Sequence, residues 1–115
     1  MSDYDVIVIG AGPAGLQAAI HASRKKVKVC VLGKLNGSAL ERAEIENYFG
    51  VQSMKGKEML EVGASSAREF GAQLLDEDAS FAIDYAIASI EQAKVAVLDA
   101  IAGHLEVEKA KRAAA

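Results

Sequence analysis

The sequence predicts an α/β fold of three layers, in which a short parallel sheet of about three strands lies between flanking helices and a long C-terminal helix. An apolar, β-branched run at residues 6–9 leads directly into a glycine-rich turn and then a helical segment. A second apolar run at residues 27–32 follows at the distance that a crossover between parallel strands requires. From about residue 81 to residue 111, apolar side chains recur at helical spacing. We expect residues 1–115 to form a single domain.

The first strand ends in a turn whose three glycines follow the GxGxxG spacing. Gly10 suits a tight turn, Gly12 lets a pyrophosphate approach the main chain, and Gly15 lets the helix pack close to the strand. Pro13 suits the first helical turn, where Ala14 also lies, and the N–H groups and positive dipole end of that turn favour phosphate. The strand, turn, helix and second strand together predict a Rossmann-like half-unit that binds a dinucleotide. A βαβ unit that has lost its ligand is the alternative.

The end of the second strand departs from the usual dinucleotide site. Such sites often place an acidic residue there, where it holds a ribose. This chain has Gly33 and Lys34 instead, and its next acidic residue is Glu41. Lys34 can meet a phosphate or remain a solvated loop lysine. The ribose contact of an NAD site is therefore missing from its expected position.

The middle of the chain alternates between short loops and regular segments. We expect a short helical turn at residues 41–45 and a partly aromatic loop at residues 46–50. A helix should follow at residues 55–70, with Gly71 as its C-cap. Residues 72–75 then form a third strand. In a Rossmann half-unit the strand order is third, second, first, and the closing helix lies across the sheet.

The C-terminal helix is long for a chain of this size. At about 1.5 Å per residue it measures about 40 Å or more, against roughly 30 Å for a compact domain, so its end should project or fray. Residues 106–115 are charged, as in a solvated tail. The apolar stripe at Ile83, Ile87, Ile90, Val97, Ile101 and Leu105 could also pack against a second copy. A homodimer would in addition cover the edges of a small sheet.

Composition narrows the function classes. The 115 residues are 51% hydrophobic and carry a net charge of −3, which does not favour nucleic acid as a partner. Cys30 is the single cysteine and suits a reducing cytoplasm. No run approaches the roughly 18 apolar residues of a membrane span, and we expect no signal peptide before the first strand. His21 and His104 each stand alone, so we expect neither a catalytic site nor a metal site.

Beside the glycine turn, the chain has a second distinctive motif, in which Glu46 and Asn47 precede two aromatic residues and Gly50. With these motifs, four stretches together resemble the FAD-binding lobe of thioredoxin reductase-like flavoproteins in the pyridine nucleotide-disulfide oxidoreductase superfamily. Residues 5–19 match the opening strand, turn and helix of that lobe, and residues 38–50 match the loop with a Glu-Asn pair before an aromatic residue and a glycine. Residues 57–75 resemble the next helix and strand. Residues 86–100 resemble the closing helix, whose N-terminus points at the flavin in that family.

The resemblance implies that FAD is the cofactor. Ser38 and Asn47 would line the ribityl and flavin side, and Asp78 with the start of the last helix would close it. Together with the glycine turn, the expected FAD contacts are Gly10, Gly12, Pro13, Ala14, Gly15, Gly33, Lys34, Ser38, Asn47, Asp78, Tyr85 and Ala86.

The chain departs from that family after the third strand, where Leu75 passes almost directly to the closing helix. The NADPH-binding lobe and the CxxC motif are missing from between them, through natural loss or deliberate minimisation, so we do not expect disulfide reduction. Glu91 and Gln92 stand where the family has small residues beside the flavin. Three functions stay open: an FAD-binding module that is redox-active through the flavin alone, a structural or self-association module, and a protein that binds ADP or NADP.

Overall fold

The computed structural model describes residues 3–115. Its elements follow one another as β1 (Val6–Ile9), α1 (Pro13–Arg24), β2 (Val29–Leu32), the 3₁₀ helices η1 (Leu35–Gly37) and η2 (Ala39–Arg42), β3 (Glu44–Ile45), β4 (Met54–Lys55), α2 (Gly56–Glu69), β5 (Gln73–Leu75) and α3 (Ala79–Ala114). The two crossovers, through α1 and through α2, are the connections that parallel strands require.

The main sheet has three parallel strands in the order β1-β2-β5. This confirms the predicted sheet and its order. Val6 pairs with Val29 on one side of β2, and Leu32 pairs with Leu75 on the other. All four residues of β2 are buried, as expected of a central strand covered on both faces.

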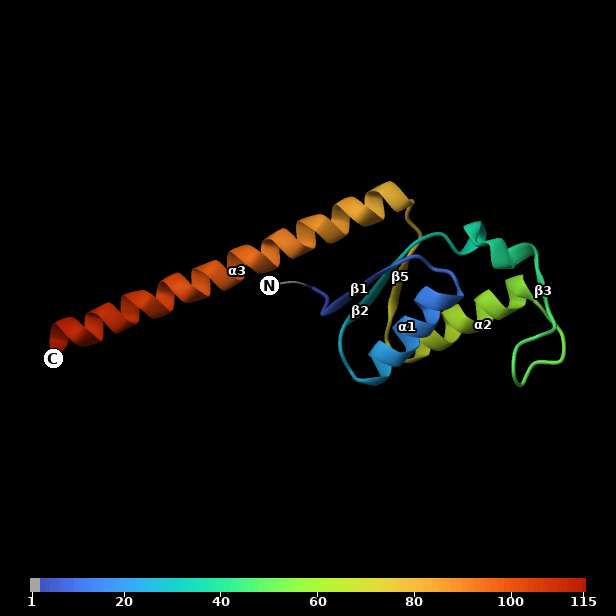
Figure 1. Ribbon diagram of the computed structural model, residues 1–115, viewed down its shortest axis with the longest axis horizontal. Helices are drawn as coiled ribbons and strands as arrows, with labels where there is room; N and C mark the ends of the chain where they lie inside the picture. The colour runs from blue at the N-terminus through green and yellow to red at the C-terminus, as the bar shows by residue number, and fades with distance from the viewer. Residues whose placement is uncertain (1–2) are drawn as a thin grey trace.

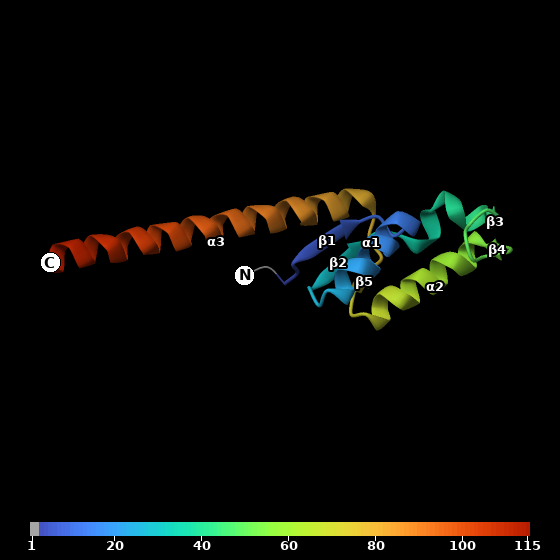
Figure 2. The same ribbon diagram turned by 60° about the horizontal axis from the view of Figure 1, so that its bottom comes forward.

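Side chains of β2 alternate between two layers of helices. Val29 and Val31 belong to a buried cluster with residues of α1 and α2, among them Ala19 and Ala67. Cys30 and Leu32 point to the other face, where they pack with Ala82 of α3. Figures 1 and 2 show α1 and α2 together on one side of the sheet and the start of α3 on the other. The three-layer prediction is confirmed.

The segment between β2 and α2 differs from the prediction. The expected helical turn at residues 41–45 is only partly right, because the 3₁₀ helix η2 ends at Arg42 and residues 44–45 form β3 instead. β3 pairs antiparallel with β4 and so forms a second, two-stranded sheet. η2 begins early because the Ser38 hydroxyl accepts a hydrogen bond from the Leu40 N–H at 3.2 Å.

α3 is longer and less covered than predicted. It spans 36 residues, and the prediction that it lies across the sheet is wrong for most of its length. Ala82 is its one buried residue among those described, and residues 90–107 are all exposed. The helix therefore projects, as its length predicts, and Figures 1 and 2 show its C-terminal part extending beyond the sheet. The molecule measures 73 × 28 × 20 Å. Within residues 3–115, no helix combines the length and apolar character that a membrane crossing requires.

Candidate functional site

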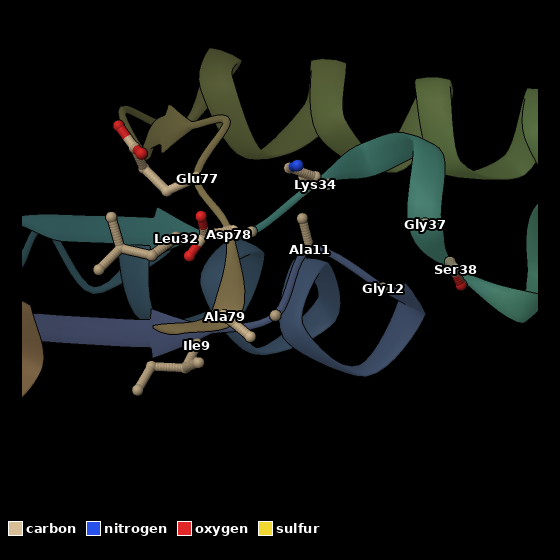
Figure 3. A pocket seen from close by; sticks show the side chains of 12 residues that line it. Ile9, Ala11, Gly12, Leu32, Lys34, Gly37, Ser38, Glu77, Asp78 and Ala79 are labelled. Atoms are coloured by element: carbon tan, nitrogen blue, oxygen red, sulfur yellow. The ribbon is translucent and has the colours of Figure 1, made fainter. Parts of the chain in front are cut away.

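A pocket of about 350 Å³ lies at the carboxyl ends of β1 and β2, where ligands bind in open α/β sheets. Three segments meet there: the β1–α1 turn, the segment after β2, and the short link between β5 and α3 (Figure 3). Its lining residues are Ile9, Gly10, Ala11, Gly12, Leu32, Gly33, Lys34, Gly37, Ser38, Glu77, Asp78 and Ala79. The glycine turn thus opens into a pocket and is not filled by the protein's own atoms.

The three glycines of the turn have different surroundings. Gly10 has a φ of 108°, a conformation that side-chain-bearing residues rarely adopt, so it permits the turn. A Cβ atom on Gly15 would lie 1.9 Å from the Gly10 carbonyl oxygen, so Gly15 permits close packing of α1 against β1. A Cβ on Gly12 would have Ser38 Oγ, at 3.6 Å, as its nearest described neighbour, which is ordinary contact. Packing therefore requires glycine at position 15 and leaves space at position 12.

The first turn of α1 can receive an anion. Gly12 is the N-cap, in extended conformation, and because it has no side chain it cannot cap the N–H groups of the first turn. The N–H groups of Ala14 and Gly15 lie in the first turn, which has no intrahelical acceptors, and Pro13 has no N–H to leave unpaired. The dipole of α1 adds partial positive charge at this point. A diphosphate is the ligand group that such a turn favours.

The segment after β2 presses against the glycine turn. A Cβ on Gly33 would lie 2.7 Å from the Ala11 nitrogen, so position 33 has no space for a side chain. Lys34 is exposed and lines the pocket as its one cationic side chain among the described lining residues. Since Glu77 and Asp78 also line the pocket, its side chains carry more negative than positive charge. Anion binding here would therefore depend on the main-chain N–H groups of α1.

The link between β5 and α3 brings a second helix start to the pocket. Asp78 caps α3, because its Oδ1 accepts a hydrogen bond from the Phe81 N–H at 2.9 Å. Asp78 and Ala79 line the same pocket as Gly12. The structure thus brings together six predicted site residues: Gly10, Gly12, Gly33, Lys34, Ser38 and Asp78.

The other predicted residues lie elsewhere. Pro13 and Ala14 line a second cavity of about 440 Å³ between α1 and α2, where Tyr48 also lies. Asn47 is exposed in the loop after β3. Tyr85 packs against the cluster of Cys30, Leu32 and Ala82, and Ala86 lines a groove beside β1. Six predicted residues are therefore not among those that line the pocket: Pro13, Ala14, Gly15, Asn47, Tyr85 and Ala86.

Sequence reasoning missed six lining residues: Ile9, Ala11, Leu32, Gly37, Glu77 and Ala79. Ile9 and Leu32 could have been found, because they end the first two predicted strands and ligands bind at that edge. Glu77 follows the third predicted strand, which the predicted order places beside the second. Its signal was weak because it belongs to a run of three acidic residues.

Cys30, the one cysteine of the chain, lies in the central strand β2. Cys30 is fully buried, and this burial raises the pKa of its thiol, although a hydrogen bond with Tyr4 opposes part of the shift. Within residues 3–115, no group of three His, Cys, Asp or Glu side chains could hold a metal ion.

Comparison with known proteins agrees with this geometry. Residues 4–113 match the model of the pyridine nucleotide-disulphide oxidoreductase family. The thioredoxin reductase of Listeria innocua is 40% identical over 83 residues, which cover 70% of this chain and 26% of that protein. The thioredoxin reductase of Bacillus subtilis is 37% identical over 83 residues, with the same coverage of 70% of this chain and 26% of that protein.

A solved structure gives the same result. The thioredoxin reductase of Giardia duodenalis superposes with a TM-score of 0.61 at 38% identity, over 65% of this chain and 25% of that one. The chain thus spans about a quarter of the length of these relatives. Because the family model covers nearly the whole chain, this chain belongs to the pyridine nucleotide-disulphide oxidoreductase family.

Proposed function

We propose that the chain is a small FAD-binding module whose pocket holds the diphosphate of the cofactor on the first turn of α1. One observation carries this proposal. Gly12 has space for a Cβ that packing does not fill, and its extended conformation (φ −80°, ψ −175°) is open to any residue. Neither the turn nor the packing demands glycine there, whereas a phosphate that must approach the main chain does.

The pocket fits the adenosine diphosphate half of FAD better than the flavin half. Its volume of about 350 Å³ lies near the lower end of the range of roughly 300–1,000 Å³ for ligand pockets. We place the adenosine beside Gly33 and Lys34, and the ribityl chain beside Ser38 and Asp78. Asn47, Tyr85 and Ala86 remain proposed contacts of the flavin side, although they lie outside the pocket. FAD, when bound, supplies the redox chemistry, and the chain supplies binding and orientation.

The binding of another adenine nucleotide is the nearest alternative. ADP and NADP share the adenosine diphosphate that the glycine turn would receive. Lys34, exposed at the pocket, supports NADP because it could pair with an additional phosphate. Glu77 and Asp78 oppose it, because two carboxylates beside a further phosphate would repel it.

The purified protein offers a direct test of this proposal. We expect a yellow protein that releases FAD on denaturation, or a colourless protein that binds added FAD. A colourless protein that binds ADP or NADP but refuses FAD would replace FAD with the alternative nucleotide. A chain that binds none of the three would overturn the nucleotide proposal. The single buried cysteine further supports a cytoplasmic location, which we propose on that ground alone.

Self-association through α3 is a second proposed property, and the exposure of its apolar stripe favours it. The stripe residues Ile83, Ile87, Ile90, Val97, Ile101 and Leu105 are each about half exposed, and a second copy could cover them. Sedimentation of Ile101→Glu should then show a loss of dimer. Ala100→Glu, which adds the same charge on another side of the same helix, should leave the dimer intact. A monomeric wild-type chain would contradict self-association.

A further inference from the structure

We infer that Glu77 holds the adenosine ribose, in place of the acidic residue that dinucleotide sites usually carry at the end of their second strand. This inference rests on the proposed nucleotide site. It gives a role to one of the lining residues that the sequence did not predict. The groups that Glu77 would recognise are the hydroxyl groups of the ribose.

The end of β2 cannot supply this carboxylate. A Cβ on Gly33 would lie 2.7 Å from the Ala11 nitrogen and 3.1 Å from the Gly10 Cα. Both neighbours are main-chain atoms of the turn and cannot move aside as a side chain would. The next residue, Lys34, carries a positive charge, and its ammonium has no acceptor lone pair for a hydroxyl group.

The neighbouring strand brings Glu77 to the same place. β5 lies beside β2, with Leu75 opposite Leu32. The Leu75 carbonyl oxygen accepts hydrogen bonds from the Gly33 N–H and from the Glu77 N–H, each at 3.1 Å. One carbonyl therefore ties the main chain of Glu77 to that of Gly33. The two residues that flank the ribose position in this proposal are fixed relative to each other.

Of the three adjacent acidic residues, Asp76, Glu77 and Asp78, Glu77 is the best placed to bind a ribose. Asp76 is exposed and is not among the lining residues of the pocket. Asp78 lines the pocket, but its Oδ1 accepts the capping hydrogen bond from the Phe81 N–H. Glu77 is half-buried and lines the pocket, and Figure 3 shows its side chain near Leu32 and Asp78 with the carboxylate directed away from Gly12. Its flexible side chain can turn toward a ligand.

A carboxylate at this position determines which nucleotides the pocket accepts. An ionised carboxylate accepts hydrogen bonds from the 2′- and 3′-hydroxyl groups of a ribose and repels a phosphate at either position. The pocket should therefore prefer ADP and FAD to nucleotides that carry a 2′-phosphate. Charge-assisted hydrogen bonds of this kind correspond to roughly 10- to 100-fold in affinity.

Calorimetric titration with ADP, 2′-deoxy-ADP and 2′-phospho-ADP tests the inference in the full chain. We expect the wild type to bind ADP at least about tenfold more tightly than either analogue. Glu77→Ala should lose most of this preference. Asp76→Ala removes a neighbouring carboxylate outside the pocket, so it changes the net charge equally and should keep the preference.

Two results would overturn the inference and can be told apart. If Glu77→Ala discriminates between the three ligands as the wild type does, Glu77 does not hold the ribose, but the nucleotide site stands. If the wild type binds neither ADP nor FAD, the proposed function fails and the inference fails with it. Should Glu77→Ala fold poorly, as judged by its urea midpoint, Glu77→Gln serves in its place, with a smaller expected loss of preference.

Discussion

The two faces of the main sheet are covered to very different degrees. On one face, α1 and α2 seal Val29 and Val31 with a cluster of small buried side chains. On the other face, the first turns of α3 cover Cys30 and Leu32 through Ala82 and Tyr85. Beyond those turns α3 leaves the sheet, and its apolar side chains from Ile90 onward are exposed. One face is thus covered by two helices, whereas the other is covered only by the first turns of α3 and by partly buried side chains such as Tyr4.

This difference shows where stability and binding originate. The sealed face depends on close contact between main chains, as at Gly15, so its packing tolerates little change. The second face depends on one helix start, which Asp78 caps. The pocket lies where the two faces meet, between the first turns of α1 and α3. Its shape therefore depends on both.

The largest expected effect on stability comes from disrupting the packing of α1 and α2 on the sheet, the sealed face. The Cβ atom of Gly15→Val would lie 1.9 Å from the Gly10 carbonyl oxygen and collide with it. We therefore expect this substitution to lower the free energy of unfolding by about 3 kcal/mol or more. Gly63→Ala is the control, because its Cβ would meet Leu16 Cδ1 at 3.4 Å and alanine favours a helix. Urea denaturation measures both. Equal midpoints for Gly15→Val and the wild type would show that this packing is looser than described.

A smaller loss of stability should follow from weakening the start of α3, which covers the second face of the sheet. Asp78→Ala removes the capping hydrogen bond to the Phe81 N–H and should cost about 1 kcal/mol of stability. Asp99→Ala removes an exposed carboxylate in the middle of the same helix and should cost little. If both variants unfold at the same urea concentration as the wild type, the cap does not hold α3 against the sheet.

The smallest effect concerns Cys30, which reports how tightly α3 covers its face. Burial raises the thiol pKa, so the folded chain should react slowly with iodoacetamide, and the chain in urea quickly. The unfolded chain releases this proton at a lower pH than the folded chain. The thiol's contribution to stability is therefore complete below its ordinary pKa and declines as the pH rises through the folded value. Equal alkylation rates with and without urea would mean that α3 leaves Cys30 open.

Much of the sealed face could be predicted from the sequence. Three local signals specify β1, α1 and β2: the β-branched run at residues 6–9, the valine-rich run at residues 27–32, and the spacing of Gly10, Gly12 and Gly15. The strand order follows from the same rules, because a crossover of this length places β2 beside β1. Five of the six predicted site residues that line the pocket lie in the segments after β1 and β2, and Asp78 lies in the link between β5 and α3.

The rest depends on contacts that sequence spacing does not reveal. The hairpin of β3 and β4 joins two-residue strands, which are too short for a periodic signal. Tyr85 lies away from the pocket because the turn of α3 that carries Ala82 sets which side of the helix faces the sheet. Glu77 lines the pocket because β5 pairs with β2; the predicted strand order implies this pairing but does not show which of the three acidic residues after β5 lines the pocket.

Titration of Gly12→Val with FAD and ADP tests the central claim most directly. Its Cβ fits the fold, so the urea midpoint should stay close to that of the wild type, as should that of Gly103→Val, a control on exposed α3. We predict that Gly12→Val weakens both ligands at least tenfold, or about 1.4 kcal/mol, while Gly103→Val binds them as the wild type does. Undiminished affinity in a folded Gly12→Val chain would show that the diphosphate does not lie on this turn.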